Sequence, residues 1–190
     1  YAAASLSGVM NVEDALKLVS RRAKMIEELP KGVMLAVPVS EKEIKFFIKS
    51  DKLSLSIVST SKQCVVSGDK DAIALLEKQL KAKEIVCRRL PGTHAFHSHM
   101  LLPIKESIKE LVNEFELKEP EIPYISNVTG TWIKPEEATD PEYWARHTCE
   151  TVHFARCIET IMENFDSDNM DQVSSERSEE RRVGKECATG

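Results

Sequence analysis

Three histidines, His94, His97 and His99, lie within the short segment Pro91-Gly-Thr-His-Ala-Phe-His-Ser-His99. Imidazole nitrogens are common zinc ligands, so three at these spacings could hold a metal ion. Metal ligands are usually fixed by regular structure and backed by carboxylates, and this segment offers neither, so we predict no metal site. Imidazole is also the usual general base near neutral pH. Two interpretations remain: one catalytic histidine among polar neighbours, or histidines that only cap and solvate a surface.

Two adjacent arginines, Arg21 and Arg22, occupy a segment with helical periodicity. The planar guanidinium binds a carboxylate through two parallel hydrogen bonds, which lysine cannot do. One of the pair could therefore clamp a substrate carboxylate, although a solvated helix face also carries such pairs. His153 lies near the start of a further predicted helix. It is either part of a site or a partly exposed helix residue.

A serine nucleophile is not evident in this sequence. The pattern G-x-S-x-G, which presents a serine on a sharp strand-to-helix turn, does not occur around any glycine. A Ser-His hydrolase or transferase therefore cannot be completed from these residues alone.

Composition narrows the class of protein. The chain has 190 residues, 42% of them hydrophobic, with 26 Lys and Arg against 31 Asp and Glu. This content can fill a core, no apolar run is long enough to span a membrane, and no basic stripe favours nucleic acid. The five cysteines form no C-x-x-C pair, which favours free thiols in a reducing compartment and predicts a cytoplasmic protein.

The first elements that must position these residues are a helix and a small sheet. Residues 11–29 read as a helix capped by Asn11, with a predicted inward stripe of Val12, Leu16, Val19, Ala23 and Ile26. Residues 33–90 follow with strands over 33–37, 53–57, 63–67 and 85–87 and helices after Ser40 and after Asp69. This β-α-β-β-α-β order is the ferredoxin-like arrangement and predicts a small inserted subdomain.

The residues after position 90 predict longer loops and helices in place of the alternating strands and helices. Residues 91–99 read as a loop, 100–117 as an amphipathic helix, 122–126 as a short strand, and 151–164 as a helix. A short helix after Asp140-Pro141 carries Tyr143 and Trp144. Residues 166–190 have few apolar side chains and no periodicity, which predicts a disordered tail. Residues 175–187 are either a genuine acidic linker or a translation of adaptor-like DNA.

Four groups of residues carry a resemblance to a known family. They are Tyr1-Ala-Ala-Ala-Ser-Leu-Ser-Gly-Val-Met-Asn-Val-Glu-Asp-Ala-Leu16, Gln63-Cys-Val-Val-Ser-Gly68, His94-Ala-Phe-His-Ser98, and Ser126-Asn-Val-Thr-Gly-Thr131 together with Tyr143-Trp-Ala-Arg-His147 and Thr151-Val-His-Phe154. Over about residues 1–165 the chain resembles the acyltransferase domain of type I polyketide synthases and fatty acid synthases, and is similar to malonyl-CoA:acyl-carrier-protein transacylase.

The resemblance implies roles for individual residues. His97 would be the general base, and Arg22 would pair with the free carboxylate of a malonyl group. His94 and Phe96 lie where the family discriminates extender units, and a bulky Phe96 would favour malonyl over methylmalonyl. His153 falls where a main-chain carbonyl orients the catalytic imidazole. The resemblance implies no metal and no cofactor. It implies malonyl-CoA as the substrate and an acyl carrier protein that bears phosphopantetheine as the partner.

The resemblance also implies an incomplete domain. Residues 1–32 and 91–165 would be part of an α/β-hydrolase-like large subdomain, 33–90 the ferredoxin-like small subdomain, and 166–190 a tail. The nucleophilic serine, in a G-H-S-x-G-E motif, is expected upstream of Tyr1, so the chain alone is expected to be inactive. Adjacent synthase domains are expected partners, and nucleic acid and membrane are not. Two alternatives stay open: a truncated standalone transacylase, or a non-catalytic ferredoxin-like binding module.

Overall fold

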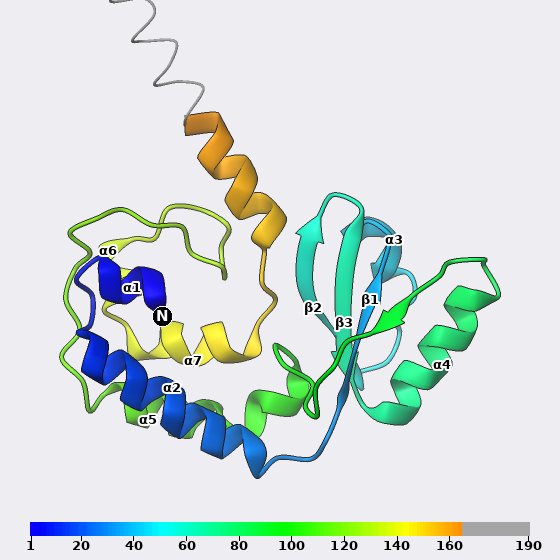
Figure 1. Ribbon diagram of the computed structural model, residues 1–190, viewed down its shortest axis with the longest axis horizontal. Helices are drawn as coiled ribbons and strands as arrows, with labels where there is room; N and C mark the ends of the chain where they lie inside the picture. The colour runs from blue at the N-terminus through cyan, green and yellow to red at the C-terminus, as the bar shows by residue number, and fades with distance from the viewer. Residues whose placement is uncertain (165–190) are drawn as a thin grey trace, which may run out of the picture. The chain divides into compact units, whose positions relative to one another are not determined.

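The computed structural model describes residues 1–164 (Figure 1). The expectations for residues 166–190 fall outside that part of the chain. The helices and strands labelled below all lie in one compact unit, Tyr1–Cys157. The helices are α1 (Ala2–Leu6), α2 (Val12–Glu27), α3 (Glu41–Lys45), α4 (Lys70–Lys81), the 3₁₀ helix η1 (His99–Ile104), α5 (Lys105–Val112), α6 (Pro135–Ala138) and α7 (Pro141–Cys149). The strands are β1 (Val33–Val37), β2 (Leu53–Thr60), β3 (Gln63–Gly68) and β4 (Arg88–Arg89). Residues 154–164 are also helical.

Helix α2 begins as predicted, with the Asn11 side chain accepting a hydrogen bond from the Asp14 backbone N–H. Its buried face differs from the prediction, because Val12, Leu16 and Val19 are exposed. The buried side chains instead follow Ala15, Leu18 and Ile26, a stripe that also passes through position 22. Because position 22 carries a charged residue, the apolar pattern alone did not indicate this stripe. In the structure Arg22 faces the interior and Arg21 lies on the outside.

The small sheet spans residues 33–89 and has the strand order β2-β3-β1-β4, with every named pair antiparallel. The predicted alternation of strand and helix is present over this segment. The fourth strand is two residues long at Arg88–Arg89, where 85–87 was predicted. Glu84 takes a left-handed backbone conformation (φ 61°), and the Ile85 N–H bonds back to Leu80, so the chain leaves α4 through a turn before it pairs with β1.

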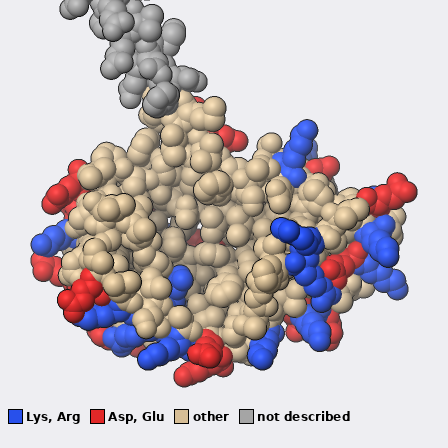
Figure 2. Space-filling model, in the orientation of Figure 1, with Lys and Arg blue, Asp and Glu red and all other residues tan. Residues whose placement is uncertain are grey.

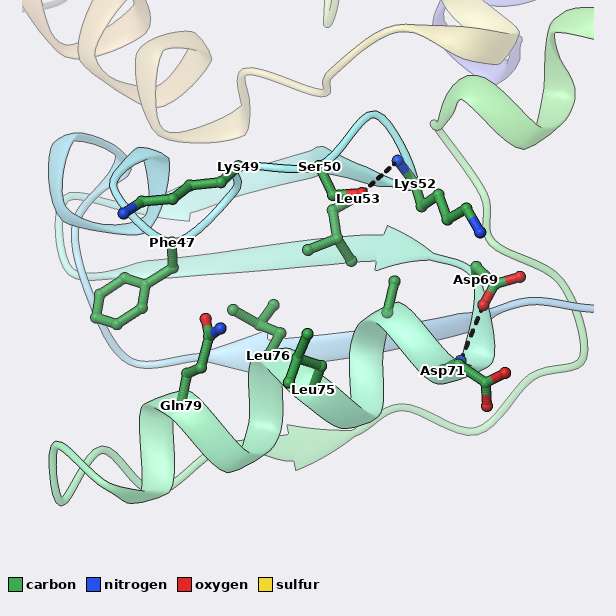
Figure 3. A pocket seen from close by; sticks show the side chains of 11 residues that line it. Phe47, Lys49, Ser50, Lys52, Leu53, Asp69, Asp71, Leu75, Leu76 and Gln79 are labelled. Carbon is green, nitrogen blue, oxygen red and sulfur yellow. Dashed lines mark hydrogen bonds between the residues drawn. The ribbon is translucent and has the colours of Figure 1, made fainter.

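One face of this sheet carries the core of residues 33–89. Its members alternate along β1 and β3 and meet Ile44 of α3 and three residues of α4. The strand members are Leu35, Val37, Cys64 and Val66, the α4 members are Ile73, Leu76 and Leu80, and Val39 and Val58 complete the cluster. Helix α3 begins at the predicted Ser40, which forms a capping box with Glu43, and Asp69 caps α4 by accepting from the Asp71 N–H (Figure 3). Both helices therefore pack on the same face, which leaves the other face free to meet the rest of the unit.

A second core gathers helices from both ends of the sequence. It contains Leu18 of α2, Leu101 of η1, Ile108 of α5 and Trp144 of α7, all close to fully buried. The predicted helix over 100–117 is shorter and begins as η1, because Pro103 lacks an N–H for the α-helical ladder. The predicted strand over 122–126 is reduced to a single bridge between Ile125 and Trp132. No helix among residues 1–164 is both long and apolar enough to cross a bilayer.

Residues 151–153 were predicted to begin a helix, but they run extended. Val152 forms a parallel bridge with Ile57 of β2, and the helical turn begins only at residue 154. The backbone N–H of Val152 donates to Ser56 O at 2.9 Å, and Val58 N–H donates to Val152 O at 2.9 Å. The edge of the small sheet is therefore joined to the segment that follows α7. This junction positions the candidate site.

Candidate active site

His97 lies in the loop between β4 and η1 with an unusual backbone conformation. Its φ is 52°, in the left-handed region that non-glycine residues seldom occupy. Such conformations persist where the surroundings hold them, and they are concentrated at functional sites. Immediately after it, the Ser98 side chain donates to Ala95 O and accepts from the Met100 N–H, which starts η1.

The imidazole of His97 is fixed at one nitrogen. Its Nδ1 lies 3.1 Å from the backbone carbonyl oxygen of Glu150. A carbonyl only accepts hydrogen bonds, so in this contact Nδ1 carries the proton and donates it. The neutral ring then presents an unprotonated Nε2, which is the form that a general base requires.

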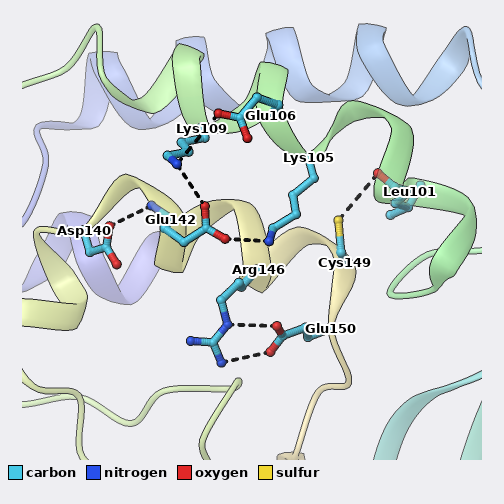
Figure 4. Close-up of polar contacts among 9 residues, drawn as sticks. All are labelled: Leu101, Lys105, Glu106, Lys109, Asp140, Glu142, Arg146, Cys149 and Glu150. Carbon is cyan, nitrogen blue, oxygen red and sulfur yellow. Dashed lines mark hydrogen bonds and ion pairs between the residues drawn. The ribbon is translucent and has the colours of Figure 1, made fainter.

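The carbonyl of Glu150 is available because α7 ends there. Glu150 is the residue after Cys149 and has extended dihedral angles, and the last carbonyls of a helix have no partner within it. Helix α7 is held in place by Lys105 and Lys109, which both pair with Glu142, and by the Cys149 thiol, which lies 3.5 Å from Leu101 O (Figure 4).

The Glu150 side chain faces a different partner from its carbonyl. Its carboxylate forms a two-point ion pair with Arg146, at 2.8 and 3.1 Å. The hydrogen bond from His97 therefore reaches the main chain of Glu150 and not its side chain. The position of the backbone at residue 150 matters more for this bond than the type of side chain there.

His153 was expected to supply the orienting carbonyl, and this expectation is wrong in the structure. The contact comes from Glu150, three residues earlier, because the chain turns from α7 into the extended segment at that residue. His153 instead uses its backbone N–H to bond Asn127 O at 2.9 Å, and its carbonyl accepts from Cys157 N–H at 3.0 Å. His153 is also one of the residues that line the pocket at His97.

Aromatic and cationic groups form a wall next to His97. The ring of His147, on α7, lies edge-on to His97 with a centroid separation of 6.3 Å. Tyr1 stacks on Trp144 at 5.4 Å, and both rings also contact His147, at 5.5 and 5.9 Å. The guanidinium of Arg22 lies 5.0 Å from the centre of the Tyr1 ring, and its Nη1 is 3.4 Å from the Tyr1 hydroxyl.

Two polar atoms in this wall are buried and unpartnered. They are Nε of Arg22 and Nδ1 of His147, neither of which has a hydrogen-bond partner among residues 1–164. Buried polar groups without partners are uncommon and each one requires an explanation. By contrast, the guanidinium of Arg21 pairs with the exposed Glu114 carboxylate, with one contact at 2.9 Å. The two adjacent arginines therefore do different things.

Burial lowers the pKa of the His97 imidazole below its ordinary value of 6.5. The hydrogen bond to Glu150 O opposes this effect, and the positive charge of Arg22 adds to it. The pKa of His147 falls further, to about 3, first because of burial and then because of the positive charges of the Tyr1 amino group and Arg22. Both rings are therefore neutral at pH 7.

A pocket of about 300 Å³ opens at His97. It is lined by Ser54, Leu55, His97, Cys149, Glu150, Thr151 and His153. Another pocket, of about 450 Å³, lies between α4 and residues 47–53 (Figure 3), and its lining contains no imidazole or thiol. On the face drawn in Figure 2, charged side chains of both signs lie around the periphery and the middle is mostly uncharged. The pocket at His97 is therefore the better candidate for chemistry.

The other two histidines of the loop point to separate partners. His94 is buried, with Nδ1 2.9 Å from the Thr93 hydroxyl and Nε2 3.2 Å from Leu29 O. The Nδ1 of His99 lies 3.0 Å from the Ser54 hydroxyl. Phe96 is partly exposed, and its carbonyl accepts a hydrogen bond from Ser56. No group of three or more His, Cys, Asp or Glu side chains in the described part of the chain could hold a metal ion.

The structure thus brings His97 and Arg22 into one region, because His97 packs near His147, His147 contacts Tyr1, and Tyr1 contacts the Arg22 guanidinium. It adds the Glu150 carbonyl, His147 and Tyr1, which the residue types alone did not single out. The sequence held one usable signal for His147: it lies three and four residues after Trp144 and Tyr143, on the buried face of the same helix.

The chain matches a known protein family over most of its length. Residues 1–171 match the family described as the acyl transferase domain. A component of the phenolphthiocerol/phthiocerol polyketide synthase of Mycobacterium tuberculosis is 33% identical over 162 residues, which cover 85% of this chain and 11% of that protein. The chain therefore spans a small part of the length of this curated relative.

Solved structures agree with the family. The acyl transferase domain of SpnD, solved as a complex with 2-(pent-4-yn-1-yl)malonyl, superposes with a TM-score of 0.81 and 37% identity, over 84% of this chain and 39% of that one. Malonyl CoA-acyl carrier protein transacylase from Clostridium perfringens gives a TM-score of 0.78 and 25% identity, over 85% and 53% of the two chains. The chain belongs to the acyl transferase domain family of polyketide synthases and acyl-carrier-protein transacylases.

Proposed function

We propose that this chain carries the general base and the carboxylate clamp of an acyltransferase that moves a malonyl group from coenzyme A to an acyl carrier protein. The observation that carries the proposal is the fixed tautomer of His97, with Nδ1 on the Glu150 carbonyl and Nε2 left basic. The chain is 33% identical to a polyketide synthase subunit and 25% identical to a malonyl CoA-acyl carrier protein transacylase, which favours a polyketide synthase as the parent protein. Adjacent synthase domains are then the expected neighbours.

The proposed reaction proceeds in two half-reactions. His97 Nε2 takes the proton of a serine hydroxyl while the serine Oγ attacks the thioester carbonyl of malonyl-CoA. The C–S bond breaks, and the coenzyme A sulfur leaves with the proton from His97. In the second half, His97 takes the proton of the carrier's phosphopantetheine thiol, whose sulfur attacks the acyl-serine. The serine oxygen then leaves and recovers its proton.

The serine of this scheme comes from a part of the domain that the sequence does not include. Two facts support this: the sequence has no G-x-S-x-G turn, and it spans 39% of the related SpnD domain. On this proposal the 190-residue chain does not transfer malonyl groups by itself. Transfer by the isolated chain would overturn the assignment of the nucleophile.

Arg22 is proposed to bind the free carboxylate of the malonyl group. Its unpartnered Nε and its position on the inner stripe of α2 support this, since a carboxylate would satisfy that N–H with a charge-assisted hydrogen bond. Phe96 is proposed to leave little room for an α-methyl group. His94 has both ring nitrogens next to atoms of its own chain, so its proposed contribution to selectivity is to fix the loop that carries Phe96.

The subdomain organisation belongs to the same proposal. We propose an α/β-hydrolase-like large subdomain formed in part by residues 1–32 and 91–165, with an inserted ferredoxin-like subdomain at 33–90. The sheet order β2-β3-β1-β4, with α3 and α4 on one face, supports the second assignment. The separate core clusters on either side of the junction support the division.

The proposal is tested by joining the chain to the preceding, serine-bearing portion of a related acyltransferase domain. Transfer of labelled malonyl from coenzyme A to a carrier protein is then followed with His97 intact and in His97→Ala. The proposal expects loss of general base catalysis, about 10²–10⁴-fold in kcat. An unchanged kcat in His97→Ala would overturn the assignment of the base.

A further inference from the structure

The edge strand β2 carries an irregularity beside the candidate site. Leu55 pairs with Val66 and Ile57 pairs with Val65, so Ser56 is an extra residue without a partner on β3. Such a β-bulge bends the strand and can redirect a side chain, and bulges are common next to active sites. The Ser56 side chain is fully buried.

Ser56 contacts both segments that hold the His97 imidazole. Its hydroxyl donates to Phe96 O at 2.7 Å, one residue before His97. Its backbone carbonyl accepts from Val152 N–H at 2.9 Å, two residues after Glu150. One residue therefore ties the loop of the imidazole to the segment whose carbonyl accepts from that imidazole.

A second serine of β2 holds the other end of the loop. The Ser54 hydroxyl accepts from His99 N–H at 3.1 Å and lies 3.0 Å from His99 Nδ1. His97 thus stands between two anchored residues, Phe96 and His99. Its left-handed backbone is strained for a non-glycine residue, and anchors on both sides are what such a conformation needs in order to persist.

We propose that Ser56 is a positioning residue for His97, with Ser54 as the second anchor of the same loop. The small subdomain then acts on the reaction through its sheet edge, by setting where the imidazole stands relative to the Glu150 carbonyl. An effect of Ser56 on catalysis rests on the proposed function, which this proposal deepens. An effect of the β2 serines on the position of the His97 ring does not depend on that function.

The test measures the His97 ring directly by NMR in the 190-residue chain, with its signals assigned from His97→Gln. Ser56→Ala removes the hydroxyl bond to Phe96 O and keeps the backbone bond to Val152. We expect the His97 pKa to rise towards its ordinary value and the Nδ1–H to exchange faster with water, because the loop loosens and the ring becomes more exposed. Native titration and native exchange in a folded Ser56→Ala would overturn the proposal.

The matched control is Ser67→Ala on β3. Ser67 is equally buried, but its hydroxyl has no hydrogen-bond partner in residues 1–164, so His97 should titrate as in the native chain. Charged and titratable neighbours of His97 stay unchanged in both variants: Arg22 from α2, His147 and the Arg146–Glu150 pair at the end of α7, and His153. If Ser56→Ala does not fold, Ser54→Ala is judged by the same two signals.

The joined, serine-bearing protein separates this proposal from the proposed function. There Ser56→Ala should lower kcat, by up to about 100-fold for a displacement near 1 Å, with little change in KM. Equal kcat values in the two serine variants, Ser56→Ala and Ser67→Ala, would overturn the catalytic meaning of the anchor. Failure of the native joined protein to transfer malonyl would instead count against the proposed function, while the NMR result on His97 would still decide the positioning.

Discussion

The imidazole of His147 makes the stability of the chain depend on pH between about 7 and 5. Its ring is packed against Tyr1 and Trp144, its Nδ1 is buried without a partner, and its pKa is lowered to about 3. The unfolded chain has an ordinary histidine with a pKa near 6.5. As the pH falls below 6.5, the unfolded state therefore binds a proton that the folded state does not.

The sign of this linkage is fixed by the lowered pKa. The contribution of His147 is fully present above about pH 6.5 and is lost progressively as the pH falls towards 3. Between about pH 7 and pH 5 it amounts to about 2 kcal/mol. His97, whose pKa is also lowered, acts in the same direction. The carboxylates with lowered pKa values, such as Glu43 and Glu142, lose their contribution at more acidic pH.

Urea denaturation at the two pH values measures this effect. His147→Gln, which does not titrate, should reduce the pH-dependent fall in unfolding free energy by about 2 kcal/mol. His153→Gln is the matched control, because that side chain lines the pocket and is not packed into the aromatic wall. If His147→Gln lost as much stability as the native chain between about pH 7 and pH 5, the burial of this imidazole would be refuted.

Three further substitutions test other parts of the structure by denaturation. Gly32→Ala would place a Cβ 2.6 Å from Ala95 Cβ, so we expect a loss of about 1–3 kcal/mol and a displaced histidine loop, and native stability would contradict that packing. Ser126→Ala removes a buried hydroxyl that contacts the Tyr143 hydroxyl at 2.8 Å and caps two backbone N–H groups, which should cost about 1–3 kcal/mol. Glu142→Gln breaks partly exposed ion pairs and should change the unfolding free energy little, and less still at high salt, so a large loss would contradict the exposure of these pairs.

Local sequence signals located several elements of the small sheet well. The capping residues Ser40 and Asp69 mark the starts of α3 and α4, as predicted. These signals act within a few residues, so they can be read without knowing the tertiary structure. The start of β4 could not be read this way, because the left-handed turn at Glu84 shifts the pairing from 85–87 to Arg88–Arg89.

The candidate site was harder to predict because its decisive contacts are between segments that are distant in sequence. Residue types indicated the loop histidines and the Arg21–Arg22 pair, and the family resemblance selected His97 and Arg22 among them. The carbonyl beside His97 depends on where α7 ends, which places it at Glu150 and not at His153. The inward stripe of α2 was wrong for a related reason: Arg22 lies on the inward stripe with its Nε buried, so a pattern that counts only apolar residues chose a neighbouring face.

The carboxylate clamp is the claim that a single comparison tests most directly. In the joined, serine-bearing protein, malonyl and acetyl transfer are measured from their coenzyme A thioesters for the native chain, Arg22→Ala and Arg21→Ala. Arg21 is the matched control on the same helix, because its guanidinium is already paired with Glu114. The proposed clamp predicts that Arg22→Ala lowers kcat/KM for malonyl far more than for acetyl, while Arg21→Ala leaves the ratio unchanged. Equal losses for malonyl and acetyl in Arg22→Ala would contradict it.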